Sequence, residues 1–309
     1  MDSLSSACAC TTPPVDDQGD SIDTLETIRT GCPALRSVFL PDNVWPKFKA
    51  WHQNRDVVAA HRSMLLLALE RGHLARLTSS AHRYLIKNGA VRQEVRRQYV
   101  KDLAERWMHH LDALERHRRS RRFNGRIAEL QCAEWLETGG WTILGLEALR
   151  QGSDIEAKSD SGMMTAFEAK FIGSQDYDFE LILCSMAGKP SVGVVSPYAA
   201  INYLLFRIYE ASKQLTTFNG HRIAVVIIDD LTWSRFDFQL ENDWIDWTNP
   251  VFFEKDSEWD AFIKTQQGRY PNLCSELQSV VGQIDKAWII RRKYGYEYHL
   301  AYELNAGRT

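Results

Sequence analysis

The stretch GSDIEAKSDSGMMTAFEAKFI, residues 152–172, decides the fold of this chain. Two segments within it, 154–158 and 164–171, predict strands because apolar, β-branched and aromatic residues recur along them. The polar residues between the two segments end at Gly162 and are typical of a tight turn. The stretch therefore predicts a β-hairpin.

The turn also predicts which residues of the hairpin face each other. A three-residue loop with its glycine in the left-handed conformation pairs Ser159 with Met163, and counting back places Asp154 opposite Glu168. Directly opposed side chains lie on one face about 5 Å apart. Lys170 shares that face because side chains alternate along a strand. The hairpin is thus expected to present two carboxylates and one ammonium together.

Two interpretations of the face that carries Asp154, Glu168 and Lys170 are open. Lys170 can form a surface salt bridge with the two acids. Alternatively, because opposed carboxylates repel each other among apolar neighbours, a cation can hold them together. Mg²⁺ binds carboxylate oxygens and keeps coordination positions for water and phosphate. The second reading predicts a site for a hard divalent cation.

A helix predicted over about 126–137 brings a third carboxylate to the sheet. Glu129 lies among apolar residues that would pack against the strands, and Glu134 is the competing choice on the same helix. Further strands are predicted over 141–144 and 221–228, and a long helix over 197–215. The resulting order of elements is α-β-β-β-α-β.

A glutamate on a first helix, an aspartate opening the second strand and Glu-x-Lys on the third resemble the PD-(D/E)xK nuclease superfamily. The matching residues are Glu129, Asp154, Glu168 and Lys170, and the resemblance covers about residues 123–230. Ser153 stands where the family has proline. The resemblance implies an α/β chain in which a restriction-endonuclease-like αβββαβ core follows a helical N-terminal domain and precedes a β-rich C-terminal extension.

The resemblance also implies an activity, namely metal-dependent hydrolysis of phosphodiester bonds, most often in DNA. Asp154, Glu168 and the backbone carbonyl of Ala169 would hold Mg²⁺, with Mn²⁺ as a substitute. Glu129 would contribute directly or through a water molecule. Lys170 would position or activate the attacking water.

Other polar residues near this motif have two readings each. Lys213-Gln214 resembles an accessory position near the phosphate, or it is an ordinary pair on a helix surface. Glu156 shares the face of Asp154 and is either a further ligand or a charge at the rim of the site.

A basic block precedes the predicted site. Between Arg83 and Arg126 there are thirteen Lys or Arg residues against five Asp or Glu, although the whole chain has a net charge of −3. Such a run is often only a solvated helix face. Next to a nuclease site it predicts phosphate contacts, since phosphates dominate nucleic-acid affinity. The candidate nucleic-acid-binding residues are Arg118, Arg119, Arg121 and Arg122, together with Lys213 and Gln214.

Composition predicts an ordinary globular protein of about two domains. Residues 1–30 predict a mobile acidic tail, 31–122 a helical domain with a basic face, and 123–309 the nuclease-like domain with its extension. No run reaches the ~18 apolar residues that would span a bilayer, so no membrane association is expected. The start of the chain lacks the features of a secretory signal, and the six cysteines lack zinc-binding spacing, so reduced thiols and a cytoplasmic location are expected.

Three functional hypotheses follow. The first is a Mg²⁺-dependent endonuclease, acting on DNA rather than RNA, in phage defence, restriction or mobile-element processing. The second is a non-catalytic nucleic-acid-binding subunit of a larger complex. The third is a nuclease that is inactive alone and is activated by a partner; whether the chain forms a homo-oligomer is left open. The acidic, tryptophan-containing segment 237–260 is a candidate partner surface, or its tryptophans anchor the extension to the core.

Overall fold

The chain forms two compact units, Met1–Trp135 and Leu136–Thr309. The computed structural model describes residues 21–53, 65, 68–69, 72–87, 93–104, 113–147, 152–173, 197–234, 236–237, 240, 246, 250–252, 257–293 and 297–305. The boundary between the units falls within the long helix α6 (Ala113–Thr138). No helix in these described ranges is long and apolar enough to cross a membrane.

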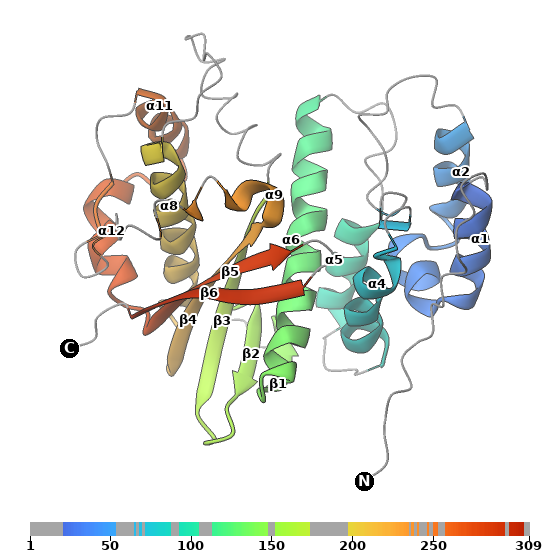
Figure 1. Cartoon of the computed structure of the whole chain (residues 1–309), viewed down its shortest axis with the longest axis horizontal. Coiled ribbons are helices and arrows are strands. Elements are labelled where there is room, and N and C mark those ends of the chain that lie inside the picture. Colours follow the sequence, from blue (N-terminus) through green and yellow to red (C-terminus); the bar gives the residue numbers. More distant parts are fainter. Residues whose placement is uncertain are drawn as a thin grey trace. The chain divides into compact units, whose positions relative to one another are not determined.

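The first unit is helical where it is described, as the sequence predicts (Figure 1). Its core buries large apolar side chains, and the ring of Phe39 packs edge-on against that of Phe123 at 6.1 Å. Part of the predicted acidic tail is ordered, because residues 21–31 form a helix that buries Leu25; residues 1–20 lie outside the described ranges. The elements are α1 (Ser21–Gly31), η1 (Leu35–Phe39), α2 (Trp45–Gln53), α4 (Leu74–Ala81), η3 (His82–Lys87), α5 (Gln93–Leu103) and most of α6.

Helix α6 begins earlier than the sequence predicts. The sequence predicts a start near Arg126, just after Asn124-Gly125, a pair that is frequent in turns. The helix instead passes through this pair from Ala113, and it buries Phe123 and Ile127 on either side. Burial of apolar residues outweighs the weak helix propensity of one glycine. The basic run 116–122 therefore belongs to α6 rather than to a connection before it.

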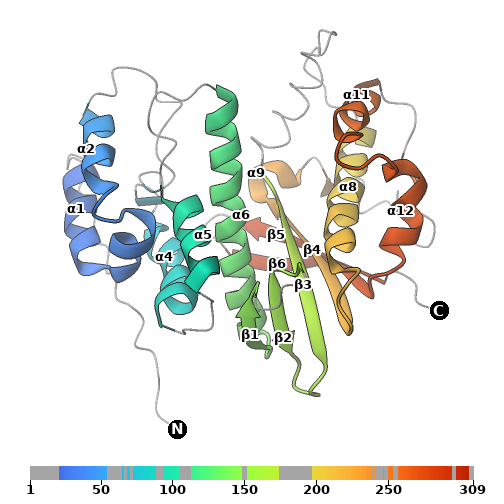
Figure 2. The same cartoon turned by 180° about the vertical axis from the view of Figure 1, so that it is seen from behind.

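The second unit contains a mixed sheet of six described strands, paired in the order β1-β2-β3-β4-β5-β6 (Figure 2). β1, β2 and β3 are antiparallel, β3, β4 and β5 are parallel, and β6 is antiparallel to β5. Helix α8 (Pro197–Leu215) lies between β3 and β4 in the chain, so the predicted α-β-β-β-α-β order is present. The strands are β1 (Thr142–Leu146), β2 (Ile155–Lys158), β3 (Met164–Ile172), β4 (His221–Asp229), β5 (Lys286–Lys293) and β6 (Glu297–Asn305).

The hairpin of β2 and β3 has the predicted register. The amide of Ser159 donates to the carbonyl of Met163 at 3.0 Å, and Gly162 has a φ of 86°. Ile155 pairs with Phe167, so Asp154, one residue earlier, stands opposite Glu168. A glycine at the left-handed position lets this three-residue loop close without backbone strain.

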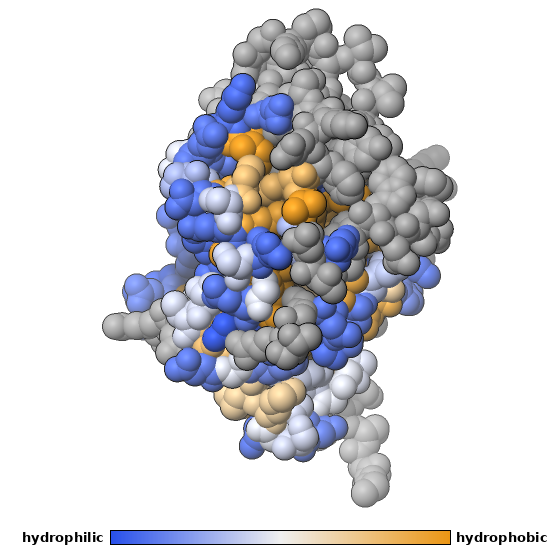
Figure 3. All heavy atoms as spheres, turned by 90° about the vertical axis from the view of Figure 1, so that its left-hand side faces the viewer, coloured by the Kyte–Doolittle hydropathy of each residue, from blue (hydrophilic) through white to orange (hydrophobic). Residues whose placement is uncertain are grey.

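Helix α8 packs its apolar side chains on one face of the sheet. Alternate residues of β3, β4 and β5 point to this face, as the pleat requires, and include Ile172, Val226 and Ile289. On the side of the unit where α8 lies, hydrophobic residues show between hydrophilic ones (Figure 3). The same face of β3 carries Glu168 and Lys170, so the helix that closes this core also borders the predicted site.

The C-terminal extension is only partly as predicted. The extension contains the antiparallel strands β5 and β6, in agreement with the prediction of β structure. The prediction that the rest is β-rich is wrong for the described residues, which form α9 (Asp230–Trp233), α11 (Ser257–Gln266) and α12 (Leu273–Val281). In α12 the buried residues Leu273, Leu277 and Val281 recur every four positions, a helical period that the prediction overlooked.

Candidate active site

Asp154 and Glu168 are joined through the backbone of the β2–β3 hairpin. The amide of Asp154 donates to Oε2 of Glu168 at 3.1 Å, and Oδ2 of Asp154 accepts a hydrogen bond from the amide of Ala169 at 2.9 Å. Each acid is thus held by an amide of the opposing strand. The side chain of Glu168 is only 1% exposed. The predicted pair of opposed acids is therefore present, with both carboxylates held in place.

Lys170 lies beside this pair. Its Nζ donates to Oε1 of Glu168 at 2.5 Å and to Oε1 of Gln214 on α8. Burial lowers the pKa of Lys170, but the negative charges of Glu168, Asp154 and Glu210 raise it by more, so the net shift is upward. The side chain is therefore an ammonium ion whose position is set by one strand and one helix.

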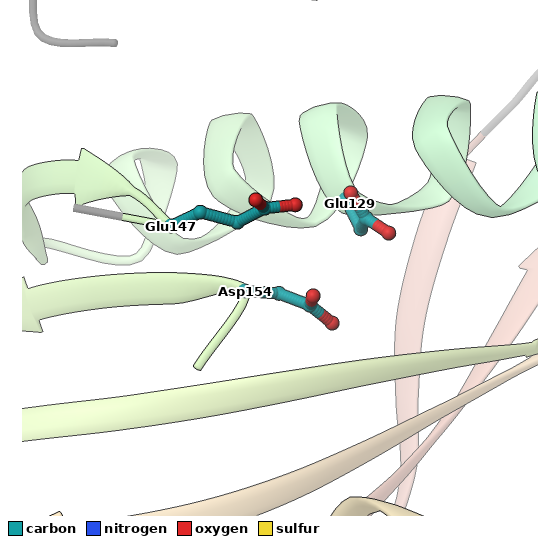
Figure 4. A group of neighbouring side chains, drawn as sticks. All are labelled: Glu129, Glu147 and Asp154. Carbon is teal, nitrogen blue, oxygen red and sulfur yellow. The ribbon is translucent and has the colours of Figure 1, made fainter. Parts of the chain in front are cut away.

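A further carboxylate, which the sequence interpretation missed, comes from the end of β1. Single carboxylate oxygens of Glu147 and Asp154 lie within 4.8 Å of each other (Figure 4). The amide of Glu147 donates to the carbonyl of Asp154 at 2.9 Å, and Glu147 has a φ of 45°. Side chains other than glycine seldom adopt this left-handed conformation. No sequence pattern marks Glu147, because the pairing of β1 with β2 shifts register between Ile143 and Gly145.

Glu129 and its alternative Glu134 both lie on α6, in the first unit. Oε2 of Glu129 accepts hydrogen bonds from the hydroxyl of Tyr99 at 2.6 Å and from Arg126 at 2.8 Å. Glu134 instead accepts a hydrogen bond from Ser79 at 3.4 Å. The choice of Glu129 as the helix carboxylate of the site stays a prediction.

Glu156 is not a charge at the rim of the site. It is 3% exposed, and its Oε1 accepts a hydrogen bond from the hydroxyl of Ser153 at 3.3 Å. The rim interpretation was wrong because the first three residues of β2, Ile155–Ala157, are buried, so this part of the strand is covered on both faces. Ser153, which stands at the family's proline position, is also buried.

The predicted accessory pair separates in the structure. Gln214 reaches Lys170, whereas Nζ of Lys213 donates to Glu276 on α12 at 2.8 Å and to the hydroxyl of Tyr209 at 3.2 Å. These hydrogen bonds raise the pKa of Lys213, and the bond to Glu276 has the larger effect. Gln214 thus joins the site, while nucleic-acid binding by either residue stays a prediction.

The four candidate arginines lie on α6. Arg122 is exposed and Arg121 is half-buried, while the side chains of Arg118 and Arg119 lie outside the described residues. Phosphate binding by this run stays a prediction. The acidic segment 237–260 is described only in part, so its role as a partner surface also stays a prediction.

The chain matches no protein-family model, and comparison with curated proteins and with solved structures finds no match.

Proposed function

We propose that this protein is a metal-dependent phosphodiesterase with a restriction-endonuclease-like core, acting on nucleic acid, with DNA as the expected substrate. One observation carries the proposal: Asp154, Glu168 and Lys170 meet on one hairpin and are joined there by Gln214 from α8. The α-β-β-β-α-β order of the surrounding elements supports it.

The oxygen atoms at the site fit a hard divalent cation such as Mg²⁺ or Mn²⁺. Asp154, Glu168 and Glu147 offer carboxylate oxygens, and Glu129 is proposed as a further ligand because of its place in the PD-(D/E)xK pattern. The carbonyl of Ala169 is a further donor, because the N–H and C=O of one strand residue point to the same neighbouring strand, and the amide of Ala169 points to Asp154. Carboxylate and carbonyl oxygens are the ligands these cations prefer.

The bound cation would supply Lewis-acid chemistry, polarising a phosphoryl oxygen and lowering the pKa of a bound water. The protein supplies the geometry. Lys170 directs two of its three ammonium hydrogens to Glu168 and Gln214, which leaves one for an attacking water or a phosphate oxygen. A fixed positive charge at that place stabilises the negative charge that develops on the phosphate during hydrolysis.

Binding of the polynucleotide is assigned to the basic run on α6. Arg118, Arg119, Arg121 and Arg122 would contact phosphates, and such contacts give affinity without reading the base sequence. A cytoplasmic role in phage defence, restriction or mobile-element processing is part of the same proposal and rests on analogy with proteins of this build.

A cleavage assay tests the proposal. The purified full chain is incubated with plasmid DNA, single-stranded DNA and RNA, with Mg²⁺ or with EDTA. The Lys170→Met variant is compared with Lys158→Met, which removes an exposed lysine from the same hairpin. We expect cleavage only with Mg²⁺, its loss in Lys170→Met, and its retention in Lys158→Met.

Two outcomes would contradict the proposal. Cleavage that persists in Lys170→Met or in EDTA would show that the assigned site is not the active one. If the wild type cleaves no substrate, even when candidate partners are added, the protein is a non-catalytic nucleic-acid-binding subunit. Cleavage that requires an added partner would identify the partner-activated form of the enzyme.

A further inference from the structure

Helix α8 carries a buried ion pair that the proposed chemistry does not use. Nη1 of Arg207 donates to Oε2 of Glu210 at 2.5 Å, and the side chains of the two residues are 8% and 6% exposed. Oε1 of Glu210 accepts a hydrogen bond from the hydroxyl of Tyr270 at 3.1 Å, and Nη1 of Arg269 lies 3.5 Å from the same oxygen. Both charged groups are therefore largely removed from water and paired with protein groups.

This pair lies on the face of α8 that meets the site. Residues 207, 210 and 214 are spaced by three and four positions, so they lie along one side of the helix. Arg207 donates through Nη2 to the carbonyl of Phe171 at 3.1 Å, and Gln214 contacts Lys170. Helix α8 is thus hydrogen-bonded to β3 at two consecutive residues, Lys170 and Phe171.

Stability alone does not account for this pair. Removing two charges from water costs free energy that their attraction often fails to recover, and a well-packed apolar pair of similar volume is frequently as stable. The hydrogen bond from Arg207 to the β3 backbone, however, needs a guanidinium with several donors in a fixed plane. The hydrogen bond to the β3 backbone therefore explains the ion pair better than a contribution to the free energy of folding does.

We propose that Arg207 and Glu210 are positioning residues that fix Lys170 relative to Asp154 and Glu168. This inference rests on the proposed function, since it assigns the pair a role at that site. Arg207 holds the backbone at Phe171, and Glu210 holds the guanidinium of Arg207 in the orientation that reaches this carbonyl. Glu210 also places a negative charge near Lys170, where it contributes to the upward shift of that residue's pKa.

The test replaces the ion pair by apolar residues of similar size, in the double variant Arg207→Met with Glu210→Leu. A second double variant, Lys286→Met with Glu303→Leu, removes a more exposed pair that joins β5 to β6 and serves as the control. We expect kcat of the first variant to fall by about 10- to 100-fold, because a displacement of about 1 Å at a reacting group has an effect of this order. KM and the melting temperature should stay close to those of the wild type.

A single substitution keeps the test valid if the double variant fails to fold. Arg207→Lys retains the positive charge next to Glu210 but cannot bond Glu210 and Phe171 with the same planar group. We expect kcat to fall while KM is unchanged. An unchanged kcat in either folded variant would overturn the proposal.

Hydrogen exchange separates this inference from the proposed nuclease activity. In the Arg207 variants the amides of residues 168–173 should exchange faster than in the wild type, while those of the β5–β6 hairpin should not change. If the wild type proves inactive but this local effect appears, the nuclease proposal fails and the positioning role remains. If exchange of residues 168–173 is unaffected, the positioning role is refuted whatever the activity.

Discussion

The main-chain amide of Asp154 donates to the carboxylate of Glu168, and the amide that follows Glu168 donates to the carboxylate of Asp154. This reciprocal pair of hydrogen bonds closes the open end of the β2–β3 hairpin. It also satisfies one oxygen of each acid, so neither carboxylate can rotate away without losing a bond. The two acids are therefore preorganised, which reduces the entropy lost when a cation binds them.

Asp154→Asn should weaken cation binding while preserving the fold. The asparagine oxygen can still accept the hydrogen bond from Ala169, but the negative charge is lost. We expect the affinity for Mn²⁺, measured by calorimetry on the full chain, to fall by at least about tenfold. Asp160→Asn, an exposed acid in the turn of the same hairpin, is the matched control. Equal affinities in the two variants would contradict the assignment of Asp154 as a ligand.

Glu147→Gly should separate the function of this residue from its effect on stability. The left-handed φ of 45° is unfavourable for a glutamate and ordinary for glycine. We expect the free energy of unfolding to rise by up to about 1 kcal/mol, while Mn²⁺ binds more weakly. Chemical denaturation and calorimetry measure the two effects. The control is Glu134→Gln, which removes the charge of a glutamate on α6. Glutamine is used there because glycine inside a helix would itself be destabilising. Unchanged Mn²⁺ affinity in Glu147→Gly would remove Glu147 from the site.

Two glycines should respond to alanine in opposite directions. Gly162→Ala forces a side chain into the left-handed conformation of the hairpin turn and should destabilise the protein by about 1–2 kcal/mol. Gly125→Ala lies inside α6, where an added Cβ meets nothing within 4 Å, and should stabilise it by up to about 1 kcal/mol. Urea denaturation measures both changes. Effects of the same sign would show that one of these local conformations is misassigned.

Alkaline pH should lower the free energy of unfolding, in part through ionisation of Tyr270. Burial, followed by the charge of Glu210, raises the pKa of Tyr270 to about 12, against an ordinary value of about 10. When folding raises the pKa of a group, the group makes its full contribution to stability at pH values below its pKa in the unfolded chain. For Tyr270 this contribution declines as the pH rises from about 10 to about 12. The free energy of unfolding should therefore decrease more steeply over this range in the wild type than in Tyr270→Phe. Parallel pH profiles would contradict the shift.

The double variant Arg118→Ala with Arg122→Ala should bind nucleic acid more weakly at low salt. Each lost phosphate contact lowers the slope of log affinity against log salt by about 0.9 for duplex DNA and about 0.7 for single strands. Fluorescence anisotropy over a range of salt concentrations, with EDTA present to prevent cleavage, measures this slope. Lys47→Ala, an exposed lysine on α2, provides the comparison. An unchanged slope in the arginine variant would show that the run is only a solvated helix face.

Local chemistry in the sequence was sufficient to predict the hairpin and the residues it brings together. Gly162 sets the turn, the turn sets the register, and the register determines that Asp154 faces Glu168 with Lys170 beside them. Each step depends on residues within the single hairpin of residues 154–170, which is why the prediction could be made without the rest of the fold.

Only the tertiary structure decided which distant residues complete the site. That Gln214 contacts Lys170 while Lys213 turns to Glu276 depends on how α8 lies between the sheet and α12. The contribution of Glu147 depends on the irregular pairing of β1 with β2, which places its amide on the carbonyl of Asp154. The hydrogen bond from Arg207 to Phe171 depends on the packing of α8 against β3. The contacts made by α8 join residues far apart in the chain, and the packing of whole elements sets their geometry, which short-range sequence patterns do not encode.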